Sequence, residues 1–453
     1  MAYLPNTDAD RRAMLERIGV ADVSSLFRDI PEGLRDPDCG LPPPAAEAEL
    51  IAELRELAGR NRPLAQWDCF LGAGIYQRFI PAIVPATTGR PEFYTAYTPY
   101  QAEASQGYLQ AIFEFQTMVA ELYGLDVANA SMYDGATATA EGALMAVAQT
   151  GRPGILAAAT LHPETLRVLD TYAAGRGATV RRIPRRGATT DLEAARALLA
   201  EDPPAVVIIG QPNFLGALEP VAELVQLAHA ASALALVVAD PVAAAVVEAP
   251  GALGADIATG DGQPLGISPQ FGGPTVGLLS CTTALLRRIP GRLAGLTTDS
   301  EGRRAFCLTL QTREQHIRRE RATSNICTNH ALMALAVTAY VGRLGAPGLE
   351  AVADVSYRRA HRLAELLSAR PGYALAFPEA DFLWEFVLRC PRPAAEVAAA
   401  LAGQGILAGL PLGGVDPALS DCLLVCATEM TTPAAIERYA AALPVSASAA
   451  VPG

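Results

Sequence analysis

An aspartate at the end of an apolar run is the first residue placed to do chemistry. Asp240 follows residues 234–239 (Leu-Ala-Leu-Val-Val-Ala) and stands directly before Pro241. Ligands of open α/β sheets bind at the carboxyl ends of such strands, where a carboxylate can pair with the pyridinium nitrogen of a bound cofactor. The structural alternative is an aspartate that opens a turn before proline. Without further information, this second interpretation is favoured.

A second candidate lies where a loop is expected to enter a helix, at Tyr133-Asp134-Gly135-Ala136-Thr137. The free N–H groups of a first helical turn, together with the helix dipole, can hold an anion such as a cofactor phosphate. Gly135 and Thr137 are the candidate residues for this role. Asp134 and Thr137 are also typical of an ordinary helix N-cap, so the motif alone is a weak signal.

A third stretch, residues 254–274, is rich in glycine and has the layout of a cofactor site. In pyridoxal phosphate (PLP) enzymes of the aspartate-aminotransferase fold, the cofactor lysine follows the pyridinium aspartate by about twenty residues. Here that interval contains Gln263 and Pro264, and all 35 basic residues of the chain are arginine. Because a Schiff base needs a lysine amine, the sequence argues against a self-sufficient PLP decarboxylase or transaminase.

Two polar segments precede predicted helices. Tyr97–Gly107 is dense in hydrogen-bonding side chains, and Arg321–Thr328 follows the basic run Arg313–Arg321. A polar loop with a helix cap is the plainer explanation for each. Cys327 and His330 stand at i, i+3, a spacing that lets two side chains face one another on a helix. A PLP-independent enzyme with a cysteine nucleophile is therefore an alternative, although no third orienting group accompanies the pair.

The elements that must position these residues are typical of an α/β domain. Between residues 150 and 280, short continuous apolar runs alternate with helical stretches, which predicts a mostly parallel sheet covered on both faces. The predicted strands are Gly154–Ala159, Ala205–Ile209, Leu234–Ala239 and Thr275–Leu279. The predicted crossover helices are Leu161–Gly175 and Leu218–Ala231.

Further helices follow from apolar residues at i, i+3 and i+4 and from capping residues. They cover residues 1–20 and 45–59 in an N-terminal arm, 109–123 with Gly124 as the terminating residue, 134–147, 329–344 and 349–369. Strands around Phe382–Leu388 and Leu423–Ala427 indicate a smaller C-terminal α+β domain.

The composition bears on partners and location. A net charge of −12 argues against nucleic acid and anionic membranes, which require a basic footprint. No signal peptide is visible at the N-terminus, and the longest apolar run, residues 233–247, is interrupted by Asp240 and Pro241. The eight cysteines form no C-x-x-C pair, so no metal site is expected. We expect a cytoplasmic protein.

Several stretches, taken together, resemble the P-protein of the glycine cleavage system, specifically its N-terminal half, which in some bacteria is a separate chain. They are Phe70–Tyr76, Tyr97–Gly107, Leu125–Ser131, Tyr133–Glu141 and Arg321–Thr328, with Met14-Leu15, Ile18-Gly19 and Ile30-Pro31 near the start. The resemblance spans nearly the whole chain in order. Thr98–Gly107 and Thr323–Cys327 are specific to the family.

The resemblance implies the α/β fold of aspartate-aminotransferase-like PLP enzymes (fold type I), with a large parallel or mixed-sheet domain and a small C-terminal α+β domain. We expect an N-terminal helical arm over residues 1–66, the large domain over 67–330 and the small domain over 331–453.

The resemblance also implies the reaction of glycine dehydrogenase (aminomethyl-transferring). PLP held by a companion subunit takes up glycine and stabilises the carbanion left by loss of CO2, and the aminomethyl group passes to the lipoyl arm of the H-protein. A chain of this kind lacks the lysine and is inactive alone. The reaction site lies at or near its interface with the PLP-bearing subunit, in a heterotetramer of two chains of each kind.

The same resemblance implies that the two polar segments face the active site of the partner subunit. We expect contributions there from Tyr76, Tyr97, Thr98, Tyr100, Gln101, Glu103, Ser105, Gln106, Thr323, Ser324 and Asn325. Tyr97, Tyr100 and Gln101 would hydrogen-bond cofactor or substrate and help to exclude water from the carbanion. The remnants of a degenerate cofactor pocket on this chain would be Gly135, Thr137, Asp240 and Gln263.

The main alternative is a purely structural subunit that stabilises the PLP-bearing chain and touches no reacting group. The absence of lysine fits both hypotheses equally. They differ in whether substitutions within residues 97–107 change the rate of reaction while the complex still assembles.

Overall fold

The computed structural model describes residues 5–35, 37–97 and 99–444. The chain divides into two units, Met1–Pro63 and Leu64–Gly453. The first unit carries the helices α1 (Asp8–Ile18) and α2 (Glu47–Ala58), as the sequence predicts for an arm. None of its described residues is buried, so this unit has no core of its own.

Seven strands form the central sheet of the second unit, in the order β2-β10-β9-β8-β7-β3-β4. Their bounds are β2 (Val127–Ala128), β10 (Gly277–Cys281), β9 (Ile257–Asp261), β8 (Leu234–Ala239), β7 (Val206–Gln211), β3 (Gly154–Ala158) and β4 (Thr179–Ile183). The strands from β9 to β4 pair in parallel, whereas β10 is antiparallel to β9 and β2. The prediction of a mostly parallel sheet is confirmed.

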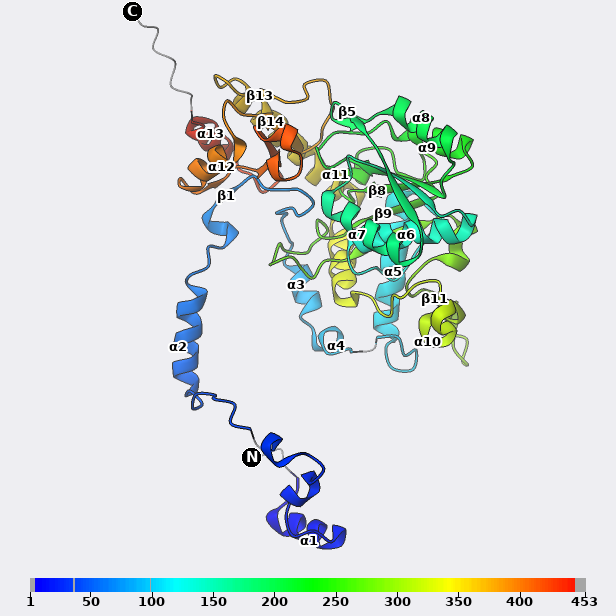
Figure 1. Cartoon of the computed structure of the whole chain (residues 1–453), viewed down its shortest axis with the longest axis vertical. Coiled ribbons are helices and arrows are strands. Elements are labelled where there is room, and N and C mark those ends of the chain that lie inside the picture. Colours follow the sequence, from blue (N-terminus) through cyan, green and yellow to red (C-terminus); the bar gives the residue numbers. More distant parts are fainter. Residues whose placement is uncertain (1–4, 36, 98, 445–453) are drawn as a thin grey trace, which may run out of the picture. The chain divides into compact units, whose positions relative to one another are not determined.

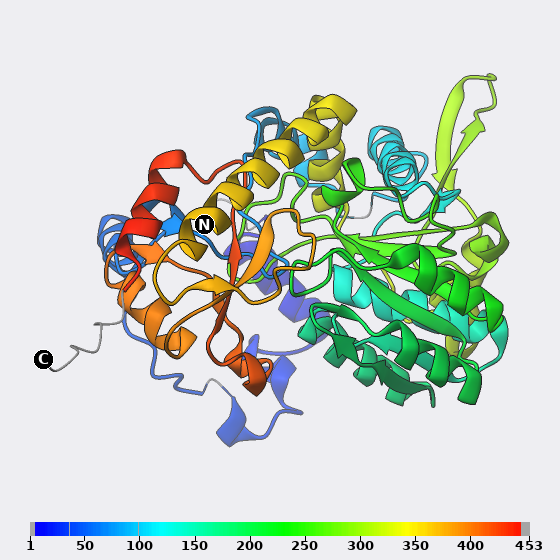
Figure 2. The same cartoon turned by 90° about the horizontal axis from the view of Figure 1, so that it is seen from above.

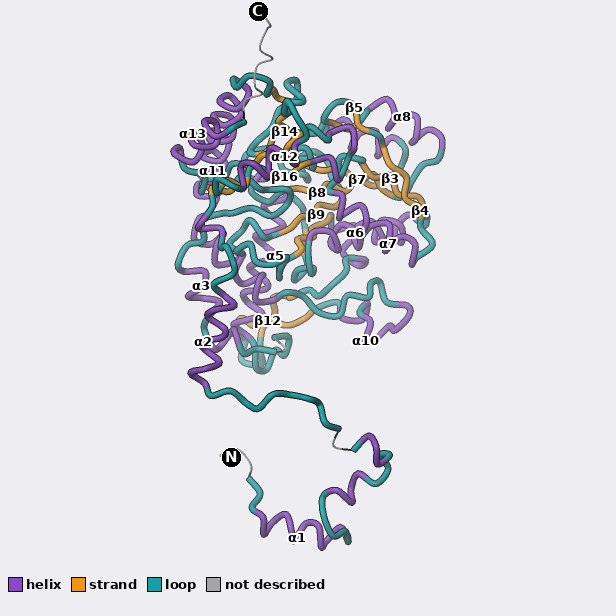
Figure 3. The backbone as a smooth tube through the Cα atoms, turned by 60° about the vertical axis from the view of Figure 1, so that its left-hand side comes forward, coloured by secondary structure: helices purple, strands orange, loops and turns teal. Residues whose placement is uncertain are grey.

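Helices cover both faces of this sheet (Figures 1 and 3). One face packs against α6 (Gly135–Thr150) and α7 (Pro163–Gly175), and the other against α5 (Gln106–Tyr123), α8 (Leu192–Glu201) and α9 (Val221–Ala230). Neighbouring strand residues alternate between the two cores: Ile155 packs with α6 and α7, and Leu156 packs with the opposite set. Burial on both sides explains why the strands are continuous apolar runs.

Helix α11 (Ala331–Ser368), yellow in Figure 2, packs against α5, α3 (Ile83–Thr88) and α13 (Pro433–Ala442). This range contains the two helices predicted for residues 329–344 and 349–369, which are separated at Gly345. The backbone of Gly345 is not helical (φ 61°, ψ −176°), and its positive φ suits only glycine. By length and composition alone α11 could cross a membrane. Its contacts are those of a helix packed in the core.

The C-terminal part contains a four-stranded antiparallel sheet in the order β13-β14-β17-β16. The elements are β13 (Ala374–Leu375), β14 (Glu385–Arg389), β16 (Leu410–Pro411), β17 (Cys422–Cys426) and α12 (Ala394–Ala402), with α13 alongside. Strand β1 (Asp68–Cys69) pairs with β15 (Ile406–Leu407) and so ties the start of this unit to its end. The division at residues 330 and 331 stays a prediction.

Several short elements were not expected from the sequence. They are α4 (Pro91–Tyr94), β5 (Arg185–Arg186), β6 (Thr189–Thr190), β11 (Ala294–Thr298), β12 (Arg304–Leu308) and α10 (Gln315–Arg318). The hairpin of β11 and β12 projects from the second unit, yellow-green in Figure 2.

Candidate functional site

A cavity of about 280 Å³ lies at the carboxyl ends of β8 and β9, beside the start of α6. Its lining comes from residues 73–76, 134–136, 162, 164–165, 238–241, 260–261 and 264, together with Pro212. The crossover connections of the parallel strands bring these segments to one edge of the sheet. Of the residues predicted for a degenerate pocket, Gly135 and Asp240 line this cavity, whereas Thr137 and Gln263 do not.

Asp240 both lines the cavity and opens a turn. It directly follows β8 and lines the cavity. Its Oδ1 accepts hydrogen bonds from the N–H groups of Val242, at 2.7 Å, and Ala243, at 3.1 Å, so it also opens the turn. Burial raises the pKa of this carboxyl, an effect opposed by the positive charge of Arg78 and by the two backbone donors.

The N-terminus of α6 is already occupied by carboxylates. Asp134 is the N-cap and accepts from the N–H of Thr137 at 2.8 Å, as predicted. Oδ2 of Asp261 accepts from the N–H of Gly135 at 2.9 Å and from the hydroxyl of Thr275 at 3.0 Å. Burial raises the pKa of Asp261, and the donors from Gly135, Gln263 and Thr275 lower it.

These residues do not fit a PLP held on this chain in the manner of fold type I enzymes. A Cβ built on Gly135 would lie 3.0 Å from both the backbone nitrogen and the Cβ of Asp261, so the turn packs tightly against the end of β9. The N–H of Gly135 already donates to a carboxylate, and a phosphate would face the negative charges of Asp134 and Asp261. A lysine is absent from the whole sequence.

Gln263 has a structural role in the position expected for a cofactor lysine. It is buried, with 1% of its surface exposed. Its Oε1 accepts from the backbone N–H of Tyr76 at 2.8 Å, and its Nε2 donates to the carbonyls of Tyr76 at 2.9 Å and Ile267 at 2.7 Å. The amide therefore joins the loop of residues 73–76 to the segment that follows β9.

Tyr76 lies in the wall of this chain's own cavity, not in the surface formed by the Tyr97–Gly107 segment. Its hydroxyl donates to Oε2 of Glu385 at 2.6 Å, and the N–H of Ala73 donates to Oε1 at 2.7 Å. Burial raises the pKa of Glu385 to about 7, although both hydrogen bonds lower it. Burial also raises the pKa of Tyr76 well above its ordinary value, and the nearby carboxylate adds to the effect.

Three residues at or behind the cavity were not predicted from the sequence: His162, Arg78 and Glu385. His162 lines the cavity, and its Nε2 lies 3.1 Å from the carbonyl oxygen of Ala73. The guanidinium of Arg78 is buried and pairs with Glu429 at 2.8 Å. A histidine shortly after the strand 154–159 could have been singled out by the reasoning applied to Asp240. The two charged residues carry no local signal.

The Tyr97–Gly107 segment divides into exposed and structural residues. Tyr97 has 95% of its surface exposed, and Gln101 and Glu103 are exposed as well. Thr98 lies outside the described residues. Ser105 is the N-cap residue of α5 but makes no side-chain cap bond. Gln106 binds both the N–H and the carbonyl of Phe306, each at 2.8 Å, and so anchors α5 to β12.

The segment from Thr323 to Asn325 is similarly mixed. The N–H of Thr323 donates to the carbonyl of Arg313 at 3.4 Å. Ser324 is buried, and its hydroxyl accepts from the N–H of Ile326 at 3.0 Å. Asn325 is exposed. Only the asparagine of these three thus presents most of its side chain to the exterior of the chain.

Tyr100 connects the two polar segments. Its hydroxyl donates to Oδ1 of Asn329 and lies 2.8 Å from Oγ1 of Thr328. The guanidinium carbon of Arg292 lies 4.2 Å from the centre of the Tyr100 ring, and Nη2 of the same arginine donates to the carbonyl of Cys327 at 2.9 Å. Two segments more than 200 residues apart in sequence are therefore joined into one surface, with Tyr100 as its brace.

The alternative with a cysteine nucleophile loses its geometric basis. The helix predicted after Thr328 begins at Ala331, so Cys327 and His330 do not share a helix. His330 is the N-cap residue of α11, and its Nδ1 lies 2.7 Å from the carbonyl oxygen of Thr275. The expectation that the pair faces one another on a helix is wrong.

Known proteins resemble this chain over nearly its whole length. The family model of the glycine cleavage system P-protein matches residues 1–440. A probable glycine dehydrogenase (decarboxylating) subunit 1 from Anoxybacillus flavithermus is 48% identical over 431 residues, which cover 95% of this chain and 96% of that protein. The protein of the same description from Thermomicrobium roseum is 46% identical, with 98% and 99% covered.

Solved structures agree with this relationship. A crystal structure of glycine decarboxylase (P-protein) of the glycine cleavage system, in inhibitor-bound form, matches with a TM-score of 0.89 and 44% identity over 98% of this chain and 99% of that chain. A sphingosine-1-phosphate lyase from Burkholderia pseudomallei, 18% identical with a TM-score of 0.64, shares the fold alone. The expected fold type I architecture is confirmed. The chain belongs to the glycine cleavage system P-protein family.

Proposed function

We propose that this chain is the subunit of glycine decarboxylase that does not bind PLP, and that it acts only together with a PLP-bearing partner subunit. Its relatives are named as subunit 1 of glycine dehydrogenase (decarboxylating), which supports a partner. Glycine is the substrate, and the lipoyl arm of the H-protein accepts the aminomethyl group. We extend the proposal to a cytoplasmic complex of two chains of each kind.

The observation that carries this proposal is the state of the chain's own pocket. The carboxylate of Asp261 accepts from the N–H of Gly135 at the helix terminus where a cofactor phosphate is expected, and Gln263 stands in the interval expected to hold a lysine. Both side chains are engaged in hydrogen bonds that hold the pocket together. This supports the proposal that the pocket has a structural role in this chain and that the cofactor chemistry takes place on the partner subunit.

The exposed surface braced by Tyr100 is the part of the chain proposed to meet the partner's site. Tyr97, Gln101 and Asn325 project from it, and side chains of this kind can hydrogen-bond substrate and exclude water when the two subunits close. Tyr100 and Arg292 hold the surface in shape. PLP bound to the partner supplies the electron sink for loss of CO2. The residues of this chain orient and shield the reacting groups.

Glycine decarboxylation by separate and mixed subunits tests the proposal. The assay contains PLP and oxidised lipoyl H-protein, with this chain alone, the partner alone, or both. We expect activity only in the mixture and no Schiff-base absorbance in this chain alone. Turnover by this chain alone would contradict the proposal. Full activity of the partner alone would also contradict it, because the reaction would not need this chain.

A further inference from the structure

Four arginines line a second cavity, about 250 Å³ in volume, to which helix α10, labelled in Figure 1, contributes Arg318. They are Arg287, Arg313, Arg318 and Arg321, and the other described lining residues, Leu310, Thr312 and Thr323, are uncharged. This cavity is separate from the one at the end of β8. Its lining therefore carries four positive charges in a chain whose net charge is −12.

Short helical turns place these arginines around the cavity. Arg287 belongs to the 3-10 turn Thr283–Arg288, and Arg313, Arg318 and Arg321 are each the last residue of a short turn. Nε of Arg318 donates to the carbonyl of Thr312 at 3.0 Å. The N–H of Thr323 reaches the carbonyl of Arg313 at 3.4 Å. These backbone contacts close the segment around the cavity.

The guanidinium of Arg313 has unused donors. Its Nη1 donates to the carbonyl of Ile289, whereas Nε and Nη2 are buried and have no hydrogen-bond partner among the described residues. A buried donor without an acceptor destabilises the folded chain, and the loss is larger when the donor is charged. The neighbouring Glu314 offsets this charge only in part, because its carboxylate is paired with Arg292 at 3.3 Å.

The other three arginines are also short of acidic partners. Arg287 and Arg318 form no ion pair within the described part of the chain, and Arg321 reaches only Glu320, at 3.9 Å, with both side chains exposed. Exposed ion pairs of this kind contribute little to the stability of the folded chain. Like charges that converge without a counter-charge repel one another, so an anion in the cavity would relieve that repulsion.

We propose that this arginine cavity binds a small phosphate monoester. A phosphate group carries close to two negative charges near neutral pH and three acceptor oxygens, and the guanidinium fork matches it in bidentate geometry. One carboxylate offers about four lone-pair sites, too few to engage four guanidinium groups in bidentate geometry. The volume lies below the range of about 300–1,000 Å³ typical of sites for drug-sized ligands, which suits a small ligand.

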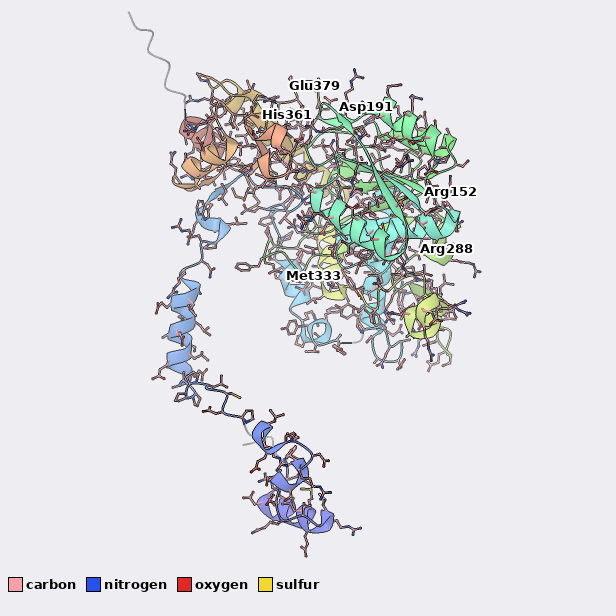
Figure 4. The ribbon with its side chains drawn as sticks, in the orientation of Figure 1. Arg152, Asp191, Arg288, Met333, His361 and Glu379 are labelled. Carbon is pink, nitrogen blue, oxygen red and sulfur yellow. The ribbon has the colours of Figure 1, made fainter. Side chains whose placement is uncertain are left out.

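Calorimetric titration of the full chain with inorganic phosphate, at constant ionic strength set by chloride, tests this site. Arg287→Gln with Arg318→Gln removes two of the four positive charges that line the cavity. Arg288→Gln with Arg319→Gln is the matched control, because these sequence neighbours do not line the cavity. Arg288, labelled in Figure 4, donates instead to Gln149 at 2.8 Å.

We expect the cavity variant to bind phosphate at least about ten-fold more weakly than the wild type, and the control variant to bind it within about two-fold of the wild type. Equal weakening in both variants, or no binding by the wild type, would overturn the proposal. A second readout needs no variant: wild-type affinity should fall as the pH is lowered through the second pKa of inorganic phosphate, where the dianion gains a proton. Affinity independent of pH in that range would also count against the site.

A parallel titration of the complex with the partner subunit distinguishes two sources of the phosphate. Binding by the isolated chain and by the complex would assign the cavity to a free small molecule. Binding by the isolated chain alone would assign it to a phosphate group that the partner presents. Both results uphold the site, and neither depends on the chain's proposed role in decarboxylation.

Discussion

The hydroxyl of Tyr100 lies 2.8 Å from Oγ1 of Thr328 and joins two segments that are 228 residues apart in sequence. A phenol has one proton, and Tyr100 donates it to Oδ1 of Asn329, so the threonine hydroxyl is the donor in the contact with Tyr100. The Tyr97–Gly107 and Arg321–Thr328 segments are thus one structural feature. Any role of either segment at the partner's site depends on this brace.

Replacement of Thr328 by valine keeps the shape of the side chain and removes the donor to Tyr100. We expect the free energy of unfolding to fall by about 1 kcal/mol, the usual loss for one hydrogen bond. Urea denaturation of the isolated chain measures this change. Thr298→Val is the control, since Thr298 is exposed on β11 and has no side-chain hydrogen bond among the described residues. The same loss in both variants would argue against the brace.

The buried carboxyl of Glu385 predicts a pH dependence of stability. Burial raises its pKa from 4.5 to about 7, so between those values the folded chain binds the proton more tightly than the unfolded chain. Stability contributed by this group therefore falls as the pH rises from about 4.5 to about 7, by at most about 3 kcal/mol. Glu385→Gln should remove this part of the dependence. Denaturation curves at pH 5 and pH 8 give the change in unfolding free energy for the wild type and for Glu385→Gln. An equal change in the two proteins would contradict the assignment of this pH dependence to Glu385.

The ion pair between Arg78 and Glu429 is almost completely buried, with 1% and 11% of the two side chains exposed. Arg78→Met would leave the glutamate charge without its counter-charge, at a cost of about 3–5 kcal/mol. Addition of Glu429→Gln should restore part of the loss, because the amide oxygen can still accept from the N–H of Phe79. Thermal unfolding of the single and double variants compares them. A double variant less stable than the Arg78→Met single variant would refute this explanation.

Asp261 is predicted to stabilise the start of α6 in place of a bound anion. Its carboxylate accepts from the N–H groups of Gly135 and Gln263 and from the hydroxyl of Thr275. Asp261→Asn turns one acceptor into a donor that faces donors, and we expect a loss of about 1–3 kcal/mol. Asp202→Asn, at an exposed site, is the control in the same urea titration. If Asp261→Asn were as stable as the wild type, whether or not the control lost stability, Asp261 would not have this role.

The sequence was most informative where a local pattern decides the structure. The end of α5 at Gly124, where φ is 64°, and the apolar strand β8 before Asp240 were both predicted. Strand β9 was missed because its sequence, Ile-Ala-Thr-Gly-Asp, reads as a turn, yet it lies between two strands that bury it. A short run in a sheet takes its conformation from its neighbours.

The candidate site was predictable only in part, because its decisive contacts are long-range. The hydrogen bonds of Gln263 with Tyr76 span 187 residues, and that of Tyr76 with Glu385 spans 309. No local pattern reveals such pairs, so Tyr76 was grouped with the wall of the partner's site although it lines the chain's own cavity. Asp261 was recognised only as part of a glycine-rich loop. Its role at the start of α6 follows from the packing of β9 beside that helix.

The central claim is that this chain acts on glycine decarboxylation through the surface around Tyr100. The most direct test is the initial rate of the assembled two-subunit complex carrying Tyr100→Phe and Gln101→Ala, with complex mass measured on the same sample. Tyr357→Phe with Gln404→Ala, two exposed residues elsewhere in the chain, is the control. We predict a rate at least about ten-fold below that of the wild type, as expected when reacting groups lose their positioning, with assembly intact. An unchanged rate in an intact complex would contradict the account.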